Sequence, residues 1–99
     1  METITLYEQD LVNALCLLEA EKKQKDPSSF EVELMWDEEY GFSAEVTEDD
    51  RSRILIEANL IEAVRFWLRY QHGRDPFSAR LELKLEEERG IVAYATYGA

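Results

Sequence analysis

The 99-residue sequence aligns with itself when it is shifted by 49 positions, so that residues 1–50 lie opposite residues 50–99 without a gap. Fourteen aligned positions are identical, and they include turn residues as well as strand residues: Leu6/Leu55, Glu8/Glu57, Leu11/Leu60, Ala14/Ala63, Asp26/Asp75, Pro27/Pro76, Ser29/Ser78, Glu33/Glu82, Leu34/Leu83, Glu38/Glu87, Glu39/Glu88, Gly41/Gly90, Ala44/Ala93 and Thr47/Thr96. Self-similarity at one fixed offset is typical of a repeated structural unit. The sequence therefore predicts a single domain over residues 1–99, built by internal duplication from the halves 1–49 and 50–99.

Each half is expected to begin with a strand. The segment SRILIEA (52–58) contains the branched residues that strands favour. Its counterpart is TITLYEQ (3–9), which should therefore be a strand as well. Asp10 lies opposite Asn59, and both residue types are good helix N-caps. We expect a helix to start directly after each of them.

Two helices follow these strands. The first is expected from about Leu11 to Gln24 and the second from about Leu60 to His72, with Gly73 placed to end the second. An Asp-Pro step follows each helix, at 26–27 and at 75–76. Proline lacks an amide donor and forces the residue before it out of helical geometry, so the chain should leave the helix there.

A pair of strands completes each half. EVELMW (31–36) and RLELKL (80–85) alternate with period two, and the returning strands are FSAEV (42–46) and IVAYA (91–95). The alternation assigns one face of these strands to the core: Val32, Leu34, Trp36, Phe42, Ala44, Val46, Leu81, Leu83, Leu85, Ile91, Ala93 and Ala95.

The resulting unit is strand, helix, strand, strand, and it occurs twice. Because both helices need a sheet against which to bury their apolar stripes, the pattern predicts an α+β fold of two layers. We expect a six-stranded, mostly antiparallel sheet with the two helices on one face and a pseudo-twofold axis between the halves. The pattern leaves the strand order open, and the first connection of each half could be parallel or split.

The acidic segment WDEEYG (36–41) invites a metal-binding interpretation, because clustered carboxylates suit calcium and Asp37 and Glu48 have the one-to-twelve spacing of an EF-hand loop. The glycine of that loop is replaced by Phe42, however, and the following residues read as a strand. In the alignment WDEEYG lies opposite LEEERG (85–90). We therefore expect two solvated hairpin turns, with the glycines at positive φ.

Catalytic chemistry finds little support in the sequence. His72 is expected to lie at a helix end, where it favours the free carbonyl groups, and Cys16 is expected near the outward side of its helix, where nothing activates it. Glycine-rich phosphate loops, CxxC and HExxH motifs do not occur. The sequence predicts no catalytic, cofactor-binding or metal-ligating residue.

Three apolar residues fall outside the core stripe of their helices. Leu17 and Phe66 occupy aligned positions roughly 160° from the centre of the stripe at 100° per residue, and Tyr70 follows Phe66 by one turn. In one interpretation they fill the flanks of a contact between the helices. In the other, Leu17, Phe66 and Tyr70 are a candidate interface that is buried in a second chain.

The charge balance excludes some partners. The chain has 22 acidic and 11 basic residues and a net charge of −11, so we expect no direct binding to nucleic acid and none to anionic membranes. The chain has one cysteine and no apolar run long enough for a signal peptide or a membrane span, which predicts a reduced, cytoplasmic protein.

The segments YEQDLVNALCLLEAEKK, VELMWDEEYGFSAEV and DPFSARLELKLEEERGIVAYA together resemble the YxcD-like family of small acidic proteins of spore-forming Gram-positive bacteria. The resemblance covers nearly the whole chain. It implies a bacterial, cytoplasmic setting and supplies no catalytic or binding residues.

The leading functional hypothesis is a non-enzymatic binding or assembly module that acts as a homodimer. An alternative is a small carboxylate-dependent hydrolase or lyase with a cleft between the repeats, and a further one is an acidic inhibitor that mimics nucleic acid.

Overall fold

The computed structural model describes residues 1–98, and it confirms the α+β class. Along the chain the elements are β1 (Glu2–Leu6), α1 (Glu8–Lys23), the short 3-10 helix η1 (Pro27–Ser29), β2 (Phe30–Asp37), β3 (Gly41–Glu48), β4 (Arg51–Leu55), α2 (Glu57–His72), β5 (Arg80–Glu86) and β6 (Gly90–Tyr97). The order strand, helix, strand, strand therefore occurs twice. Neither α1 nor α2, the α-helices of this described part, is long and apolar enough to cross a bilayer.

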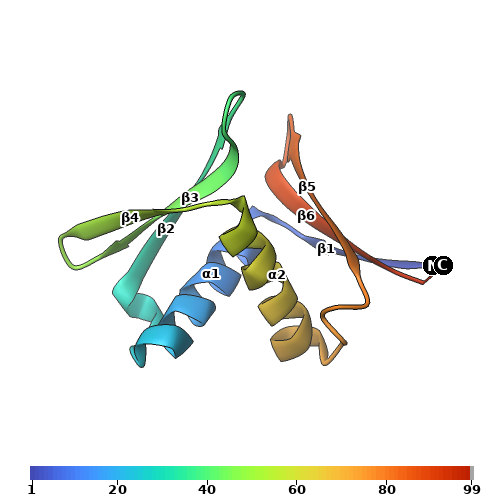
Figure 1. Ribbon diagram of the computed structural model, residues 1–99, viewed down its shortest axis with the longest axis horizontal. Coiled ribbons are helices and arrows are strands. Elements are labelled where there is room, and N and C mark those ends of the chain that lie inside the picture. The colour runs from blue at the N-terminus through green and yellow to red at the C-terminus, as the bar shows by residue number, and fades with distance from the viewer. Residues whose placement is uncertain (99) are drawn as a thin grey trace.

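The strands form two separate three-stranded sheets, so the expectation of one six-stranded sheet is wrong. One sheet has the order β1-β6-β5 and the other has the order β2-β3-β4, and all pairings are antiparallel. In Figure 1 the hairpin ends of the two sheets lie near each other at the top, the sheets spread apart from there, and the helices lie side by side at the lower centre. Alternating hydrophobicity fixes which face of a strand is buried, but it does not determine which edges pair.

The two sheets have the same register when residues are compared with their partners in the 49-residue alignment. Leu6 pairs with Ala93 in one sheet, and Leu55 pairs with Ala44 in the other. The first strand of each half thus joins the hairpin of the other half, β1 with β6 and β4 with β3. This agreement is what an internal duplication predicts.

Both helices begin earlier than predicted. The N-caps are Tyr7 and Ile56, whereas Asp10 and Asn59 lie three residues further on. The Asp10 carboxylate accepts the Tyr7 N–H at 3.0 Å, and the Asn59 Oδ1 accepts the Ile56 N–H at 2.9 Å. A short side-chain oxygen can serve either position of a capping box, which explains the displaced start.

The helix ends agree with the sequence. α2 ends at His72, and Gly73 takes the left-handed conformation at φ 61°. α1 ends at Lys23, one residue early, and Gln24 takes the same conformation at φ 57°. After each helix an aspartate closes the turn, because the Asp26 carboxylate accepts the Ser28 N–H and the Asp75 carboxylate accepts the Phe77 N–H, both at 2.9 Å.

The core lies between the helices and the two sheets, in two adjoining clusters. Leu34, Phe42, Trp67 and Leu83 pack against both clusters. The predicted core face of the strands is confirmed in phase, although it is not buried throughout: Trp36 and Leu85, the last core-facing residues before each hairpin turn, are exposed. The ends of the β2–β3 and β5–β6 hairpins project beyond the helices in Figure 1, which leaves both side chains partly in solvent.

Candidate functional site

The predicted interface residues lie on the helix pair. Leu17 and Phe66 are partly buried, and Tyr70 is 62% exposed. The rings of Phe66 and Tyr70 stack with their centroids 5.4 Å apart and their planes within 10°. The helices pack against each other, with Ala14 and Ala63 buried in the same core cluster. Leu17 and Phe66 therefore fill the flanks of the contact between the helices, whereas the ring of Tyr70 is exposed.

Two grooves flank the helix pair, each enclosing about 480 Å³. The first groove runs along α1 and is lined by Val12, Cys16, Leu17, Pro27, Ser28 and Trp67, among others. The second groove runs along α2 and is lined by Leu18, Ile61, Arg65, Phe66, Pro76 and Phe77, among others. Each of these six positions differs by 49 from a position of the other groove. The grooves are thus equivalent in place.

The grooves differ in their side chains. The first groove has no charged residue in its lining, whereas the lining of the second includes Arg65, Arg69 and Glu62. Where the first groove has the small Ser28, the second has Phe77, which is 79% exposed and lies 5.5 Å from the Arg65 guanidinium. One groove is hollow at the point where the other carries a protruding ring.

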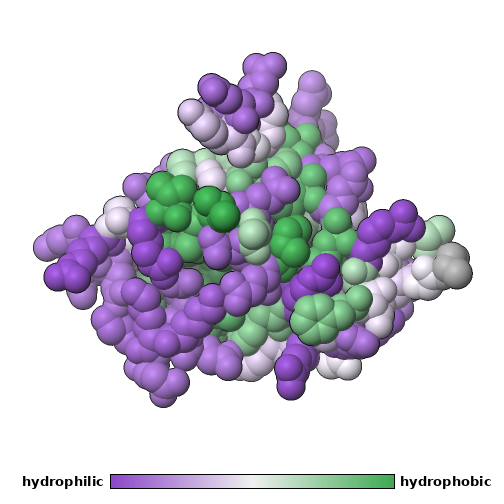
Figure 2. Space-filling model, in the orientation of Figure 1, coloured by the Kyte–Doolittle hydropathy of each residue, from purple (hydrophilic) through white to green (hydrophobic). Residues whose placement is uncertain are grey.

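We call the two grooves and the adjoining hollow around Glu21, Phe66, Arg69 and Tyr70 the helix face. Its charged residues are Glu21, Glu62, Arg65 and Arg69, so its net charge is zero. The whole chain has a net charge of −11. Figure 2 shows hydrophobic areas separated by hydrophilic side chains on the surface. The helix face is therefore a neutral region of a strongly acidic molecule.

Cys16 and His72 do not come together as a catalytic pair. The Cys16 thiol lies closer to the interior than expected, because it packs against the core and donates to the Phe30 carbonyl at 3.7 Å. Burial raises the pKa of this thiol, which disfavours the reactive thiolate. His72 is exposed at the end of α2.

The acidic segments form exposed turns. The Asp37 carboxylate accepts the Glu39 N–H at 2.8 Å and the Tyr40 N–H at 3.0 Å, so this acid closes the hairpin. Gly41 and Gly90 have φ values of 78° and 73°, as predicted for the turn glycines. Within residues 1–98, acidic, cysteine and histidine side chains form no group of three or more that could hold a metal ion.

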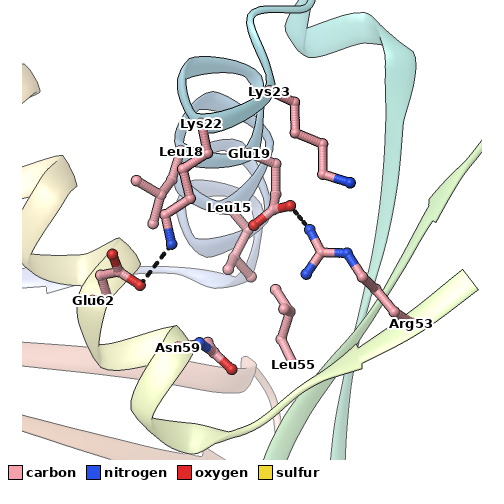
Figure 3. A pocket seen from close by; sticks show the side chains of 9 residues that line it. All are labelled: Leu15, Leu18, Glu19, Lys22, Lys23, Arg53, Leu55, Asn59 and Glu62. Carbon is pink, nitrogen blue, oxygen red and sulfur yellow. Dashed lines mark hydrogen bonds and ion pairs between the residues drawn. The ribbon is translucent and has the colours of Figure 1, made fainter.

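A polar cavity, which sequence reasoning missed, lies beneath α1. Glu19 is the buried charged residue of the described chain, with 3% of its surface exposed. Its Oε1 forms an ion pair with the guanidinium of Arg53 in β4, and the Arg53 side chain is 44% exposed. Both side chains line a cavity of about 190 Å³ together with Leu15, Leu18 and Leu55, as Figure 3 shows.

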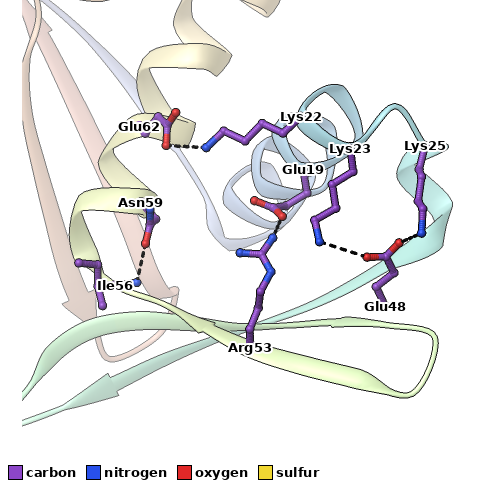
Figure 4. A network of polar contacts seen from close by, with 9 residues as sticks. All are labelled: Glu19, Lys22, Lys23, Lys25, Glu48, Arg53, Ile56, Asn59 and Glu62. Carbon is purple, nitrogen blue, oxygen red and sulfur yellow. Dashed lines mark hydrogen bonds and ion pairs between the residues drawn. The ribbon is translucent and has the colours of Figure 1, made fainter.

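Further ion pairs surround this cavity (Figure 4). Lys22 pairs with Glu62 at 3.0 Å, and Lys23 pairs with Glu48 at 3.4 Å. Glu48 also accepts a hydrogen bond from Lys25, which lowers the pKa of Glu48 and raises the pKa of Lys25. Five of the eleven basic residues gather at this corner of an acidic chain: Lys22, Lys23, Lys25, Arg51 and Arg53.

The aligned halves contained a clue to this cavity. Glu19 lies opposite Leu68 and Arg53 lies opposite Ile4, so the ion pair aligns with two aliphatic residues. Leu68 is fully buried, and Ile4 packs against the same core cluster. A charged residue aligned with a core leucine is a sequence feature that could have identified the site.

Comparison with known proteins gives a family without a described activity. Searches of curated proteins and of solved structures found no match. Residues 1–88 match a protein family, a match that spans most of the chain from β1 through the β5–β6 turn. The chain therefore belongs to the family described as protein of unknown function (DUF2653).

Proposed function

We propose that the protein is a non-enzymatic binding module that self-associates through the helix face. The observation that carries the proposal is the neutrality of this face together with the exposed rings of Tyr70 and Phe77. Two copies of a chain with a net charge of −11 repel each other. A contact across a neutral, aromatic face places the acidic surfaces apart and keeps that repulsion small.

A second copy fits this face by shape. In a twofold dimer the same surface of both copies meets, so a protrusion on one side of the axis must enter a hollow on the other side. The second groove supplies the protrusion with Phe77, and the first groove supplies an uncharged hollow at Ser28. Aromatic rings that fill such hollows are typical of residues that dominate interface energies.

The alternatives have less support. Glu38, Glu39, Glu87 and Glu88 are all exposed at the hairpin turns, so no observation favours a carboxylate-dependent hydrolase or lyase there. An inhibitor that mimics nucleic acid would rest on net charge alone, and acidic surfaces also serve solubility. The bacterial and cytoplasmic setting implied by the YxcD-like resemblance belongs to the same proposal.

Sedimentation velocity at micromolar concentration tests the proposal. The wild type is expected to sediment as a species of twice 11.6 kDa, and added salt should strengthen the association because it screens the repulsion between acidic copies. The variant Y70S/F77S should weaken it by at least about tenfold, because each exposed ring contributes on the order of 1 kcal/mol or more. A matched control is Y40S, which removes an 80% exposed ring from the β2–β3 turn and should change nothing.

Two results would overturn self-association through this face. One is a monomeric wild type at both low and high salt. The other is a dimer that Y70S/F77S leaves as stable as Y40S does. Capture of a basic protein from cell extract that is lost at high salt would instead favour the nucleic-acid mimic.

A further inference from the structure

We infer that the cavity between α1, β4 and α2 is a binding site for a small aliphatic zwitterion of the α-amino acid class. This inference is independent of the helix face. It rests on the buried carboxylate of Glu19, on the cations around it and on the size and apolar floor of the cavity.

The buried charge is not required by the fold. A charged side chain out of water is unfavourable unless it is paired and hydrogen-bonded, and replacing a buried ion pair by aliphatic residues is often neutral or stabilising. The molecule itself contains the aliphatic version, because the aligned positions hold Leu68 and Ile4. Glu19 and Arg53 therefore need an explanation other than stability, and ligand binding supplies one.

The pair leaves binding capacity unused. Glu19 Oε1, the atom that contacts the Arg53 guanidinium, is buried beside the cavity, and an ionised carboxylate has about four lone-pair sites, so it can accept from further donors. A guanidinium has five N–H donors, so Arg53 can hold Glu19 and a second carboxylate at once. Asn59 Oδ1 is occupied by the Ile56 N–H, which leaves the Asn59 amide group as a further donor at the wall.

Both signs of charge line the cavity, and this selects the ligand. A simple amine would meet Lys22, Lys23 and Arg53, and a simple anion would meet Glu19 and Glu62. A zwitterion satisfies both sets, with its ammonium at Glu19 and its carboxylate at Arg53 and Lys23.

The volume of the cavity and its apolar floor further narrow the class of ligand. A cavity of about 190 Å³ is smaller than the roughly 300–1,000 Å³ that accommodates drug-sized molecules. It is larger than the roughly 30 Å³ that one water occupies. Leu15, Leu18 and Leu55 form an apolar floor, so the substituent of the ligand should be aliphatic.

Titration calorimetry with three matched probes tests the site on the full chain. L-leucine carries both charges, 3-methylbutylamine lacks the carboxylate and 4-methylpentanoate lacks the ammonium. A thermal-shift screen of the twenty protein amino acids first identifies the best side chain. We expect saturable binding by an aliphatic member, and at least about tenfold weaker binding by its two singly charged analogues, because each lost charge-assisted hydrogen bond is worth about a factor of ten or more.

Variants separate the site from the fold. E19Q keeps the shape of the side chain and should weaken binding by at least about tenfold, because the ammonium loses its charged partner. E19L/R53I gives this cavity the aliphatic residues of the aligned positions, Leu68 and Ile4, and should abolish saturable binding while the circular dichroism spectrum stays that of the wild type. The exposed β5 residue Glu82 provides the control, since E82Q should bind as the wild type does.

Three results would overturn the inference. The first is the absence of saturable binding by any of the twenty amino acids at millimolar concentration. The second is equal binding by the zwitterion and by either singly charged analogue. The third is unchanged affinity in E19Q, a readout that stands even if E19L/R53I fails to fold.

Discussion

Around α1 a buried carboxylate meets a guanidinium, Glu19 with Arg53, whereas the aligned positions around α2 hold Leu68 and Ile4 in an apolar cluster. The backbone is the same in both places, because β4 pairs with β3 in the register in which β1 pairs with β6. The second region shows that the fold can bury aliphatic residues at these positions. The charges of the first region are therefore better explained by a function than by stability.

The two grooves of the helix face, on the surface of the molecule, also differ in their side chains at aligned positions. Cys16 and Ser28 in the first groove lie opposite Arg65 and Phe77 in the second. The Arg65 guanidinium donates to the Pro76 carbonyl and lies over the Phe77 ring. These two contacts hold the aromatic ring at the edge of the second groove. The two grooves therefore occupy equivalent positions but present different side chains, as two surfaces that bind to each other require.

The largest effect is expected from placing the charge of the first region into the second. L68E buries a carboxylate at a fully buried position, where the residue aligned with Arg53 is the uncharged Ile4, and it should lower the free energy of unfolding by about 3–5 kcal/mol. Adding I4R should restore part of that loss, because Ile4 lies opposite Arg53 in the alignment. Guanidinium unfolding followed by circular dichroism measures both variants.

The exchanged pair E19L/R53I is the matched control, and it should stay within about 1.5 kcal/mol of the wild type. The comparison between the two regions breaks down if L68E is tolerated as well as this control is. It also breaks down if I4R brings no recovery to L68E.

A smaller effect should separate the two hairpin turns. Alanine at Gly41 or Gly90 must adopt a positive φ, which costs about 1–2 kcal/mol. At Gly90 a side chain would also collide with the Glu8 carboxylate, whose Oε2 accepts the Ile91 N–H at 3.0 Å. At Gly41 the nearest atom is the Glu57 Oε1 at 3.4 Å, which is an ordinary contact.

We therefore expect G90A to lose about 2–3 kcal/mol and G41A about 1 kcal/mol less, measured by guanidinium unfolding. The double variant E8A/G90A isolates the cause, because without Glu8 the excess loss at Gly90 should disappear. Equal losses in G41A and G90A would show that Glu8 moves away freely.

Much of the architecture could be predicted from the sequence because turn chemistry and periodicity are local. The sequence correctly predicts a positive φ at Gly41 and Gly90 in the hairpin turns and the end of the second helix at Gly73, since few other residues accept the left-handed conformation without strain. The helix starts were displaced because Asp10 and Asn59 suit two positions of a cap equally well. The residue types alone do not choose between those positions.

The pairing of edges and the polar cavity could not be predicted from local patterns. Whether the six strands close into one sheet depends on contacts between distant segments, such as β1 with β6. Glu19 was not recognised because a single glutamate on a helix is ordinarily solvated. Its burial follows from the position of β4, which brings Arg53 from 34 residues further along the chain.

The smallest effect tests where the two regions should behave alike. The Asp26 carboxylate accepts hydrogen bonds from the backbone N–H and the hydroxyl of Ser28, and the Asp75 carboxylate accepts them from the Phe77 N–H and the Ser78 hydroxyl. These bonds hold the pKa of each aspartate below its usual value of 3.8.

A carboxyl group whose pKa is lower in the folded state stabilises the fold at pH values above the pKa of the unfolded state. That contribution is lost as the pH falls through the pKa of the folded state. D26N and D75N should therefore each lower stability slightly and equally at neutral pH, and their difference from the wild type should shrink below about pH 4. Urea unfolding from pH 7 to pH 2.5 measures this, with D50N in the exposed β3–β4 turn as the control. If only one of the two variants shows the pH-dependent difference, the two Asp-Pro turns are not equivalent. The two halves would then resemble each other in their strands but not in these turns.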